Sequence, residues 1–247
     1  MIKFFRKIRY DLMEKNKTAK YFKYAIGEIV LVVIGILIAL QVSNWNTQRN
    51  DKKWLTSVLS DIKIDLQKDT IGFSNIIKKI PNLIDNARLS LNRTEFDSVS
   101  ANFLLGEFPD TYYPYSIQNQ AFQKILDARV TNFFELDSIY KKINVYYTIG
   151  LNGYNEIKGW DKNGTLEDGK FFASMGIEDA FTSLKNIRLV QSEAIRKKIF
   201  IEQINSPQLR NILRENIYRK KRFKNTVTNM KLAATRILKN IDEILEE

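Results

Sequence analysis

The sequence predicts an all-α protein, with one N-terminal transmembrane helix followed by an elongated multi-helix bundle. Three observations lead to this fold class. Residues 24–42 form a long apolar stretch, and the residues after it carry apolar side chains at the 3- and 4-residue spacing of amphipathic helices. The alternation typical of strands is nowhere sustained. Four Pro and ten Gly in 247 residues also disfavour collagen-like and Gly/Pro-rich disordered chains.

The stretch from Tyr24 to Val42 is long enough to cross a bilayer. As a helix it would span about 28 Å, close to the thickness of the hydrocarbon core. Aromatic residues stand at both ends, namely Tyr21, Phe22, Tyr24 and Trp45. A cleaved signal peptide and a buried core helix are the alternatives. The long basic segment that precedes the stretch and the poor cleavage site at residues 41–43 favour a retained membrane helix.

Charge on the two sides of this helix predicts its orientation. Eight basic residues precede the helix and three follow it closely: Lys3, Arg6, Lys7, Arg9, Lys15, Lys17, Lys20 and Lys23, then Arg49, Lys52 and Lys53. Positive residues are retained in the cytoplasm. We therefore expect a cytoplasmic basic amphipathic segment over 1–23, a transmembrane helix over 24–45, and an extracytoplasmic (periplasmic) helical domain over 46–247.

The N-terminal segment has the pattern of a helix that lies on a membrane surface. Apolar residues recur at helical spacing among basic ones, which are Lys3, Arg6, Lys7 and Arg9. Such a helix binds the anionic inner leaflet, so membrane lipid is the expected partner. Nucleic acid is the other common partner of a basic patch. It is disfavoured here because a membrane span follows so closely and no aromatic residues interleave with the charges.

Two stretches carry a resemblance to a known family. They are MIKFFRKIR at residues 1–9 and KYFKYAIGEIVLVVIGILIALQVSNWN at residues 20–46. Over residues 1–50 the chain resembles an uncharacterised Bacteroidota family of small single-pass membrane proteins (domain of unknown function, family 6090). The resemblance implies a Gram-negative inner-membrane protein with a periplasmic domain. It implies no activity.

Small residues and one carboxylate share a face of the membrane helix. Gly27, Gly35 and Ala39 follow one line at multiples of four residues, and Glu28 lies beside that line. Small residues let helices approach closely, and a polar group can bond across the contact. We interpret this face as a helix-packing surface. Two alternatives stay open, because Glu28 can instead face the headgroups or take part in a proton or ion relay.

Two long apolar stripes predict the main helices of the bundle. The first runs from Leu55 to Ile80 with Asp69 as its only polar member, and Pro81 is expected to end it. The second runs from Phe223 to Ile244, in a helix that begins at Pro207 after a Ser206 cap. They are expected to pack antiparallel. Between them we expect helices at 82–92, 97–105, 116–130, 134–158 and 178–204, with a break over 159–169.

Three local features are candidate binding sites. The aromatic loop with Tyr112, Tyr113 and Tyr115 can line a ligand cleft, although aromatic packing that caps the bundle is the favoured explanation. The oxygen-rich stretch 161–169 lacks the Gly and the carboxylate that a calcium loop requires at its sixth and twelfth positions, so we expect a solvated Asn-Gly turn. The third is a basic run on a helix, for which a solvated helix face is the favoured interpretation and binding of an anionic partner is the alternative: Arg219, Lys220, Lys221, Arg222 and Lys224.

Composition narrows the possible functions. The chain has no Cys and no His, which excludes disulfides, thiolate and imidazole metal ligands, and the usual catalytic triads. It has no phosphate-binding Gly-rich loop and no nucleophile elbow. We expect no cofactor, no metal and no enzyme activity. The leading hypothesis is a non-catalytic envelope protein that assembles with itself or with another membrane protein. The alternative is a ligand-sensing ectodomain that signals through a membrane partner.

Overall fold

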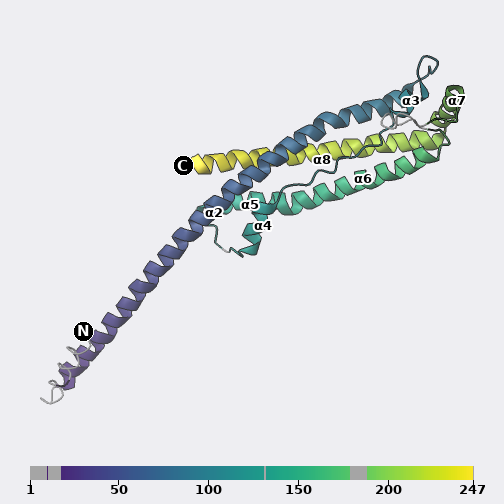
Figure 1. Cartoon of the computed structure of the whole chain (residues 1–247). Helices are drawn as coiled ribbons and strands as arrows, with labels where there is room; N and C mark the ends of the chain where they lie inside the picture. Colours follow the sequence, from purple (N-terminus) through teal and green to yellow (C-terminus); the bar gives the residue numbers. More distant parts are fainter. Residues whose placement is uncertain (1–9, 11–17, 131, 179–187, 247) are drawn as a thin grey trace. The chain divides into compact units, whose positions relative to one another are not determined.

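The computed structural model describes Tyr10 and residues 18–130, 132–178 and 188–246. Within these ranges every regular element is a helix, which confirms the predicted all-α fold (Figure 1). The chain divides into two compact units, Met1–Thr56 and Ser57–Glu247. The predicted N-terminal surface helix lies outside the described residues, and so does part of the helix expected over 178–204.

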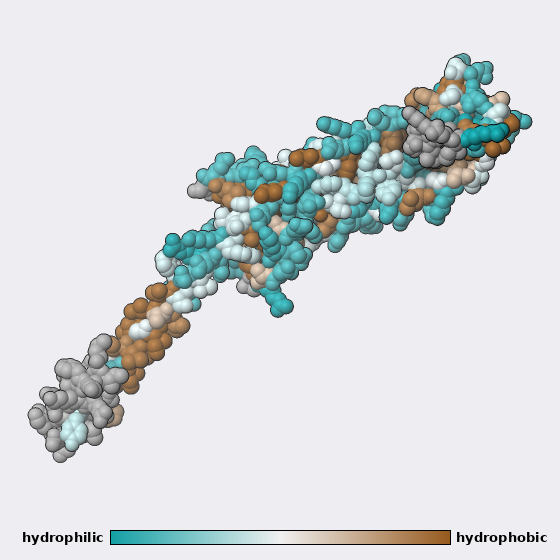
Figure 2. All heavy atoms as spheres, viewed as in Figure 1, coloured by the Kyte–Doolittle hydropathy of each residue, from teal (hydrophilic) through white to brown (hydrophobic). Residues whose placement is uncertain are grey.

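In the first unit the structure describes mainly the beginning of α2, Thr18–Asn92. The large apolar side chains between Ile26 and Val42 are all exposed, the least of them by 47% of its surface. They form the apolar segment coloured brown in Figure 2. By its length and composition this helix can cross a membrane.

In the second unit α2 continues as a bundle helix and passes through Pro81. The predicted stripe is buried as expected, from Leu55 to Ile80. The expected end at Pro81 is wrong, because Ile84 and Ala87 extend the buried stripe beyond the proline. Proline removes one backbone donor from a helix. Continued burial of the following turns outweighs that loss, and the helix expected at 82–92 is the last part of α2.

Helix α8, Pro207–Glu246, packs antiparallel to the bundle part of α2 (Figure 1). Lys63 of α2 pairs with Asp242 near the end of α8 at 2.6 Å. At the opposite end, Leu91 packs against the cluster that contains Leu209 and Leu213. The predicted start of α8 is confirmed, since the Leu209 amide donates to the Ser206 hydroxyl at 3.2 Å.

The third long segment runs without interruption from α5 to α6. Helix α5, Asp137–Val145, is followed by the π-helical turn η2, Tyr146–Gly150, and then by α6, Leu151–Ser174. The predicted break at 159–169 is wrong, because these residues lie inside α6. Their oxygen-rich side chains do not form a surface turn. Several of them are buried against α8, as described below.

Shorter elements complete the second unit. They are α3 (Ala101–Leu105), α4 (Gln120–Asp127), η1 (Phe134–Leu136) and α7 (Glu193–Ile204). The main core joins α2, α4, α5, α6 and α8. A second core gathers around Phe108 and Phe200 and joins α3, α7 and the start of α8. The bundle thus has two apolar cores along its length.

Candidate functional site

Asp69 occupies the centre of the main core. This carboxylate on α2 is completely buried. It accepts hydrogen bonds from the Tyr115 hydroxyl at 2.8 Å, the Gln118 amide at 3.0 Å and the Tyr146 hydroxyl at 3.0 Å. One side chain therefore joins α2, the aromatic loop and η2. We call Asp69, Tyr115, Gln118 and Tyr146 the Asp69 cluster.

Burial controls the electrostatics of this cluster. It raises the pKa of Asp69, although the three hydrogen bonds oppose that change, and nearby Asp65 raises it further. The pKa values of Tyr115 and Tyr146 are also raised, first by burial and then by the neighbouring Asp69. The phenols therefore remain protonated donors at neutral pH. The cluster is an arrangement of one acceptor and three neutral donors.

The aromatic loop of the sequence prediction is fixed against this cluster. The Tyr115 ring lies directly over Gly72, where a Cβ atom would collide with it. The backbone carbonyl of Tyr115 accepts hydrogen bonds from the Tyr154 hydroxyl and the Lys158 ammonium, at 2.9 and 3.0 Å. Tyr113 packs against the main core. Tyr112 lies near Lys162, whose ammonium is 5.8 Å from the ring centre. Only part of this loop therefore faces solvent.

A second polar cluster joins α6 to α8, and we call it the α6–α8 network. Lys220 is completely buried and donates to Asp161 and to the Thr165 hydroxyl, both at 2.9 Å. Two turns beyond Asp161 on α6, Asp168 pairs with Arg219. Asn216 donates to Asp168 at 2.7 Å and to the Pro109 carbonyl at 3.1 Å, which ties the start of the aromatic loop to α8.

Desolvation is the largest influence on the charged groups of this network. Burial raises the pKa values of Asp161 and Asp168, against the opposing effect of the cations beside them. Burial likewise lowers the pKa of Lys220, against the pull of Asp161. The Arg219 side chain lies on Gly164, where a Cβ would meet it too closely. Gly164 is therefore a packing site for Arg219 and not a turn residue.

The predicted basic patch on α8 needs correction. Arg219 and Lys220 face the bundle interior, and their charges are neutralised by α6. Lys221 and Arg222 are exposed, and Lys224 is half-buried. A helix turns by about 100° per residue, so a run of five basic residues cannot share one face. The surface available to an anionic partner is smaller than the sequence suggested.

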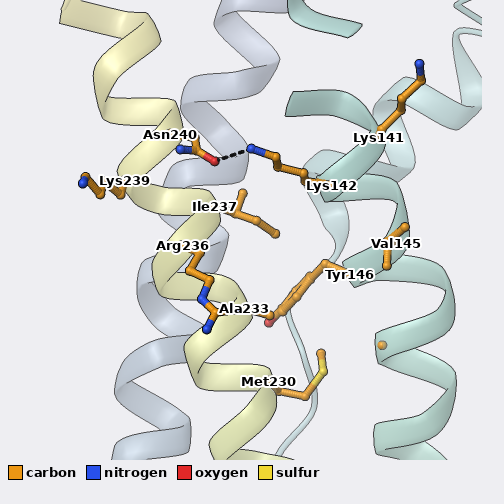
Figure 3. A pocket seen from close by; sticks show the side chains of 11 residues that line it. Lys141, Lys142, Val145, Tyr146, Met230, Ala233, Arg236, Ile237, Lys239 and Asn240 are labelled. Atoms are coloured by element: carbon orange, nitrogen blue, oxygen red, sulfur yellow. Dashed lines mark hydrogen bonds between the residues drawn. The ribbon is translucent and has the colours of Figure 1, made fainter. Parts of the chain in front are cut away.

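A groove opens between the α5–η2 segment and α8 (Figure 3). Its volume is about 660 Å³. The lining combines apolar side chains with four basic residues: Lys141, Lys142, Val145, Tyr146, Gly150, Met230, Ala233, Arg236, Ile237, Lys239 and Asn240. The Tyr146 ring lines the groove while its hydroxyl donates to Asp69. The Asp69 cluster therefore fixes one wall of the groove.

A smaller hollow of about 370 Å³ lies where the aromatic loop meets the end of α6. Phe108, Asp110 and Phe172 are among its lining residues. None of the three loop tyrosines predicted as ligand contacts lines it. In the part of the chain that the structure describes, no group of three or more acidic residues is arranged to hold a metal ion.

The residues predicted for membrane-helix packing lie on exposed parts of α2. No atom lies within 4 Å of a Cβ built at Gly27 or Gly35, so both positions are open. Ala39 is exposed and Glu28 is half-buried. The predicted lipid-binding residues Lys3, Arg6, Lys7 and Arg9 lie outside the described residues. The structure thus places Gly27, Gly35 and Ala39 on an exposed surface of α2.

Sequence reasoning missed both buried polar clusters as sites, yet each leaves a signal. Asp69 is the one acid on an apolar stripe. In α6, Asp161, Thr165 and Asp168 continue the stripe of Tyr154 at spacings of 7, 4 and 3 residues. Polar residues at core positions of two facing helices predict buried pairs. The intervening glycines concealed this pattern, because they suggest a turn.

Comparisons with known proteins agree with the resemblance noted in the sequence. No curated protein and no solved structure matches the chain. The resemblance is confirmed by a family model whose matched segment begins at Glu28 and continues through the bundle part of α2. Residues 28–93 of the chain match the model of DUF6090, a family of unknown function.

Proposed function

We propose that this protein is a non-catalytic, single-pass inner-membrane protein that presents a periplasmic helical interaction domain and assembles through its membrane helix. The observation that carries the proposal is the exposed apolar surface of α2 between Ile26 and Val42. A helix that is apolar on all sides and unburied by its own chain needs a nonpolar surrounding. A bilayer provides it.

The charge distribution supports a cytoplasmic N-terminus. Eight basic residues precede the apolar stretch and three follow it closely. This bias retains the N-terminal side in the cytoplasm. The unit Ser57–Glu247 is then periplasmic, in accordance with the Gram-negative family that the N-terminal stretches resemble.

The open line of small residues supports assembly within the membrane. Gly27, Gly35 and Ala39 leave a shallow strip on α2 along which a second helix can approach closely. Glu28 borders this strip. A carboxyl group at such a contact is stabilised by a polar partner on the neighbouring helix. The partner is a second copy of this chain or another envelope protein.

The buried polar clusters support a structural domain over an enzyme. Asp69, Asp161 and Asp168 are bonded to donors within the bundle, where they join helices. Catalytic carboxylates require access to a substrate. The exposed surfaces of the bundle are available for partners.

Cysteine labelling in cells tests the topology. Because the chain has no Cys, single substitutions give clean reporters. We expect a membrane-impermeant maleimide to label Ser98→Cys, at an exposed turn, once the outer membrane is permeabilised. Asn16→Cys should react only after lysis of the inner membrane. The reverse pattern would contradict the orientation, and labelling of both before lysis would exclude a membrane-retained N-terminus.

Assembly is tested by crosslinking and native mass in lipid nanodiscs. Gly35→Leu should reduce the assembled fraction by about fivefold or more, because a large side chain blocks close approach. Val33→Leu is the matched control, since it lies on the opposite side of the helix and changes size only slightly. Glu28→Gln tests the polar contact. A monomer in the unsubstituted protein, or equal assembly in Gly35→Leu, would contradict the proposal.

A further inference from the structure

The groove between the α5–η2 segment and α8 has the dimensions of a small-molecule site. Its volume of about 660 Å³ lies within the range of about 300–1,000 Å³ that such sites occupy. Met230, Ala233, Ile237 and Asn240 line it from successive turns of α8. The apolar residues among them, from Met230 to Ile237, extend over about 10 Å of the helix axis, so the apolar floor is elongated. An elongated floor accommodates a ligand with a flexible alkyl chain better than a ligand with a compact ring.

One hydrogen bond crosses the groove near the end of α8 that carries Asn240. The Lys142 ammonium donates to the Asn240 side-chain oxygen at 2.8 Å, which bridges its two walls (Figure 3). A helix with side chains is about 10 Å wide and does not pass beneath such a bridge. The groove therefore favours a slender ligand over a partner helix.

All charged residues that line the groove are basic. Two of them are engaged within their own helices, since Lys141 pairs with Asp137 and Lys239 lies 3.9 Å from Glu243. Arg236 differs. It is exposed, extends along α8 in Figure 3, and makes no hydrogen bond or ion pair with any residue that the structure describes. Guanidinium groups bind carboxylates in a bidentate manner. Arg236 is therefore positioned to receive an anionic head group.

The backbone at the groove is irregular. The π-helical turn Tyr146–Gly150 forms part of one wall, and such turns are found frequently at functional sites. Gly150 lies against Met230, whose sulfur would be 3.1 Å from a Cβ at that position. Methionine adapts its shape to apolar ligands. Tyr146 begins the same π-helical turn, and its hydroxyl donates a hydrogen bond to Asp69, which fixes the position of its ring.

We infer that this groove binds a single-chain anionic amphiphile of the fatty-acid class. The acyl chain lies on the apolar floor formed by Val145, Tyr146, Met230 and Ala233. Its carboxylate binds Arg236, with Lys142 nearby. This binding is noncovalent. It assigns a ligand to the bundle and goes beyond the proposed assembly of the membrane helix.

The test uses the full-length protein in nanodiscs of neutral phosphatidylcholine. A 16-carbon fatty acid that carries a photoreactive diazirine is added, and labelled peptides are identified by mass spectrometry after illumination. We expect labels on residues 145–150 and 230–237. Arg236→Glu should reduce this labelling by about tenfold, because a carboxylate would then be repelled. Ala233→Trp should reduce it similarly by filling the floor.

Matched controls lie on the same helix. Arg214→Glu makes the same charge change at an exposed position, and Leu232→Trp introduces the same indole side chain at the neighbouring exposed residue. Both should label like the unsubstituted protein. If Ala233→Trp fails to fold by circular dichroism, the surface substitution Arg236→Glu still decides the question.

Several outcomes would overturn the inference. They are labelling elsewhere in the bundle, unchanged labelling of Arg236→Glu, and equal labelling by the corresponding photoreactive hexadecanol, which carries no charge. Stronger labelling of the groove by a two-chain photoreactive phospholipid would assign the groove to membrane lipid. Protection of the groove by self-association, seen as a loss of labelling with rising protein content per nanodisc, would assign it to a second copy.

Discussion

The two buried polar clusters of the bundle stabilise buried carboxylates in different ways. The Asp69 cluster surrounds one carboxylate with three neutral donors. The α6–α8 network sets two carboxylates against two cations. In the first, charge is stabilised by dipoles alone. In the second, opposite charges compensate each other, and neutral groups such as Thr165 and Asn216 add further hydrogen bonds.

This difference predicts how substitutions in each cluster should affect the stability of the protein. Removing one member of a buried ion pair leaves an uncompensated charge, whereas removing both members can be nearly neutral. Replacing a carboxylate that is bonded to several neutral donors by a neutral acceptor of the same shape should lower the free energy of unfolding by less. Three substitution sets and one pH series break or sharpen this comparison, and we consider them from the largest expected effect to the smallest.

Lys220→Met should have the largest effect. It leaves Asp161 buried without its cation and should lower the free energy of unfolding by about 3–5 kcal/mol. The double variant Asp161→Leu, Lys220→Met removes both charges and should recover most of that loss. Urea unfolding of the full-length protein in nanodiscs measures both. If the double variant is as unstable as the single one, uncompensated charge is not the cause.

Asp69→Asn should cost less, about 2 kcal/mol. The amide keeps one acceptor oxygen but turns its NH₂ group toward a donor. Asp85→Asn is the matched control on the same helix, because Asp85 is exposed and pairs with Arg88 at the surface. It should change stability by less than about 0.5 kcal/mol. Equal losses in the two variants would show that Asp69 does not hold the three segments together.

Glycine substitutions compare the two clusters at their packing sites. Gly72→Ala should press on the Tyr115 ring and Gly164→Ala on the Arg219 side chain, each lowering stability by about 1–3 kcal/mol. Gly159→Ala is the control in α6, because open space surrounds that position. Alanine there should raise stability by about 0.5–1 kcal/mol. Thermal unfolding resolves these opposite signs, and a stabilising Gly164→Ala would refute the packing of Arg219 on this glycine.

The pH dependence should show the smallest effect. Burial raises the pKa of Asp69 above its ordinary value of 3.8, so the folded protein binds this proton more tightly than the unfolded chain does. The stabilising contribution of the protonated carboxyl is complete below the ordinary value and is lost as the pH rises through the raised one. Asp69→Asn removes this titration.

Unfolding midpoints measured from pH 3.5 upward, in steps of about half a unit, test this expectation. Midpoints of the unsubstituted protein should fall with rising pH more steeply than those of Asp69→Asn. Asp161 and Asp168 have pKa values shifted in the same direction. Both remain in the variant, so the difference between the two proteins isolates Asp69. Parallel curves would contradict a raised pKa for this group.

The long apolar stripes were predictable because each repeats over many turns. The stripe of α8 and its Ser206 cap emerged as expected. Residues 151–174 were not predictable in the same way. Four glycines and several acids in α6 suggest a loop by local preference. The helix forms because its polar stripe finds partners on α8, which a single stretch of sequence does not show.

The same reason limited prediction of the sites. The basic run 219–224 looks like a surface patch until the acids that face Arg219 and Lys220 are known. The groove depends on side chains from segments about 90 residues apart. Asp69 was recognisable as an exception on its stripe, but its donors come from a loop and a π turn. Long-range pairing decides these features, and local spacing does not contain it.

The π turn at Tyr146–Gly150 has a consequence for the evolution of this segment. It adds one residue to the helical repeat, so both Tyr146 and Tyr147 face the core. Deleting one residue there would restore a regular helix and rotate all of α6 by about 100° relative to α5. Asp161 and Asp168 would then turn away from α8. The turn acts as a phase adjustment between two halves of one helix, and insertions or deletions beside it must occur in compensating pairs.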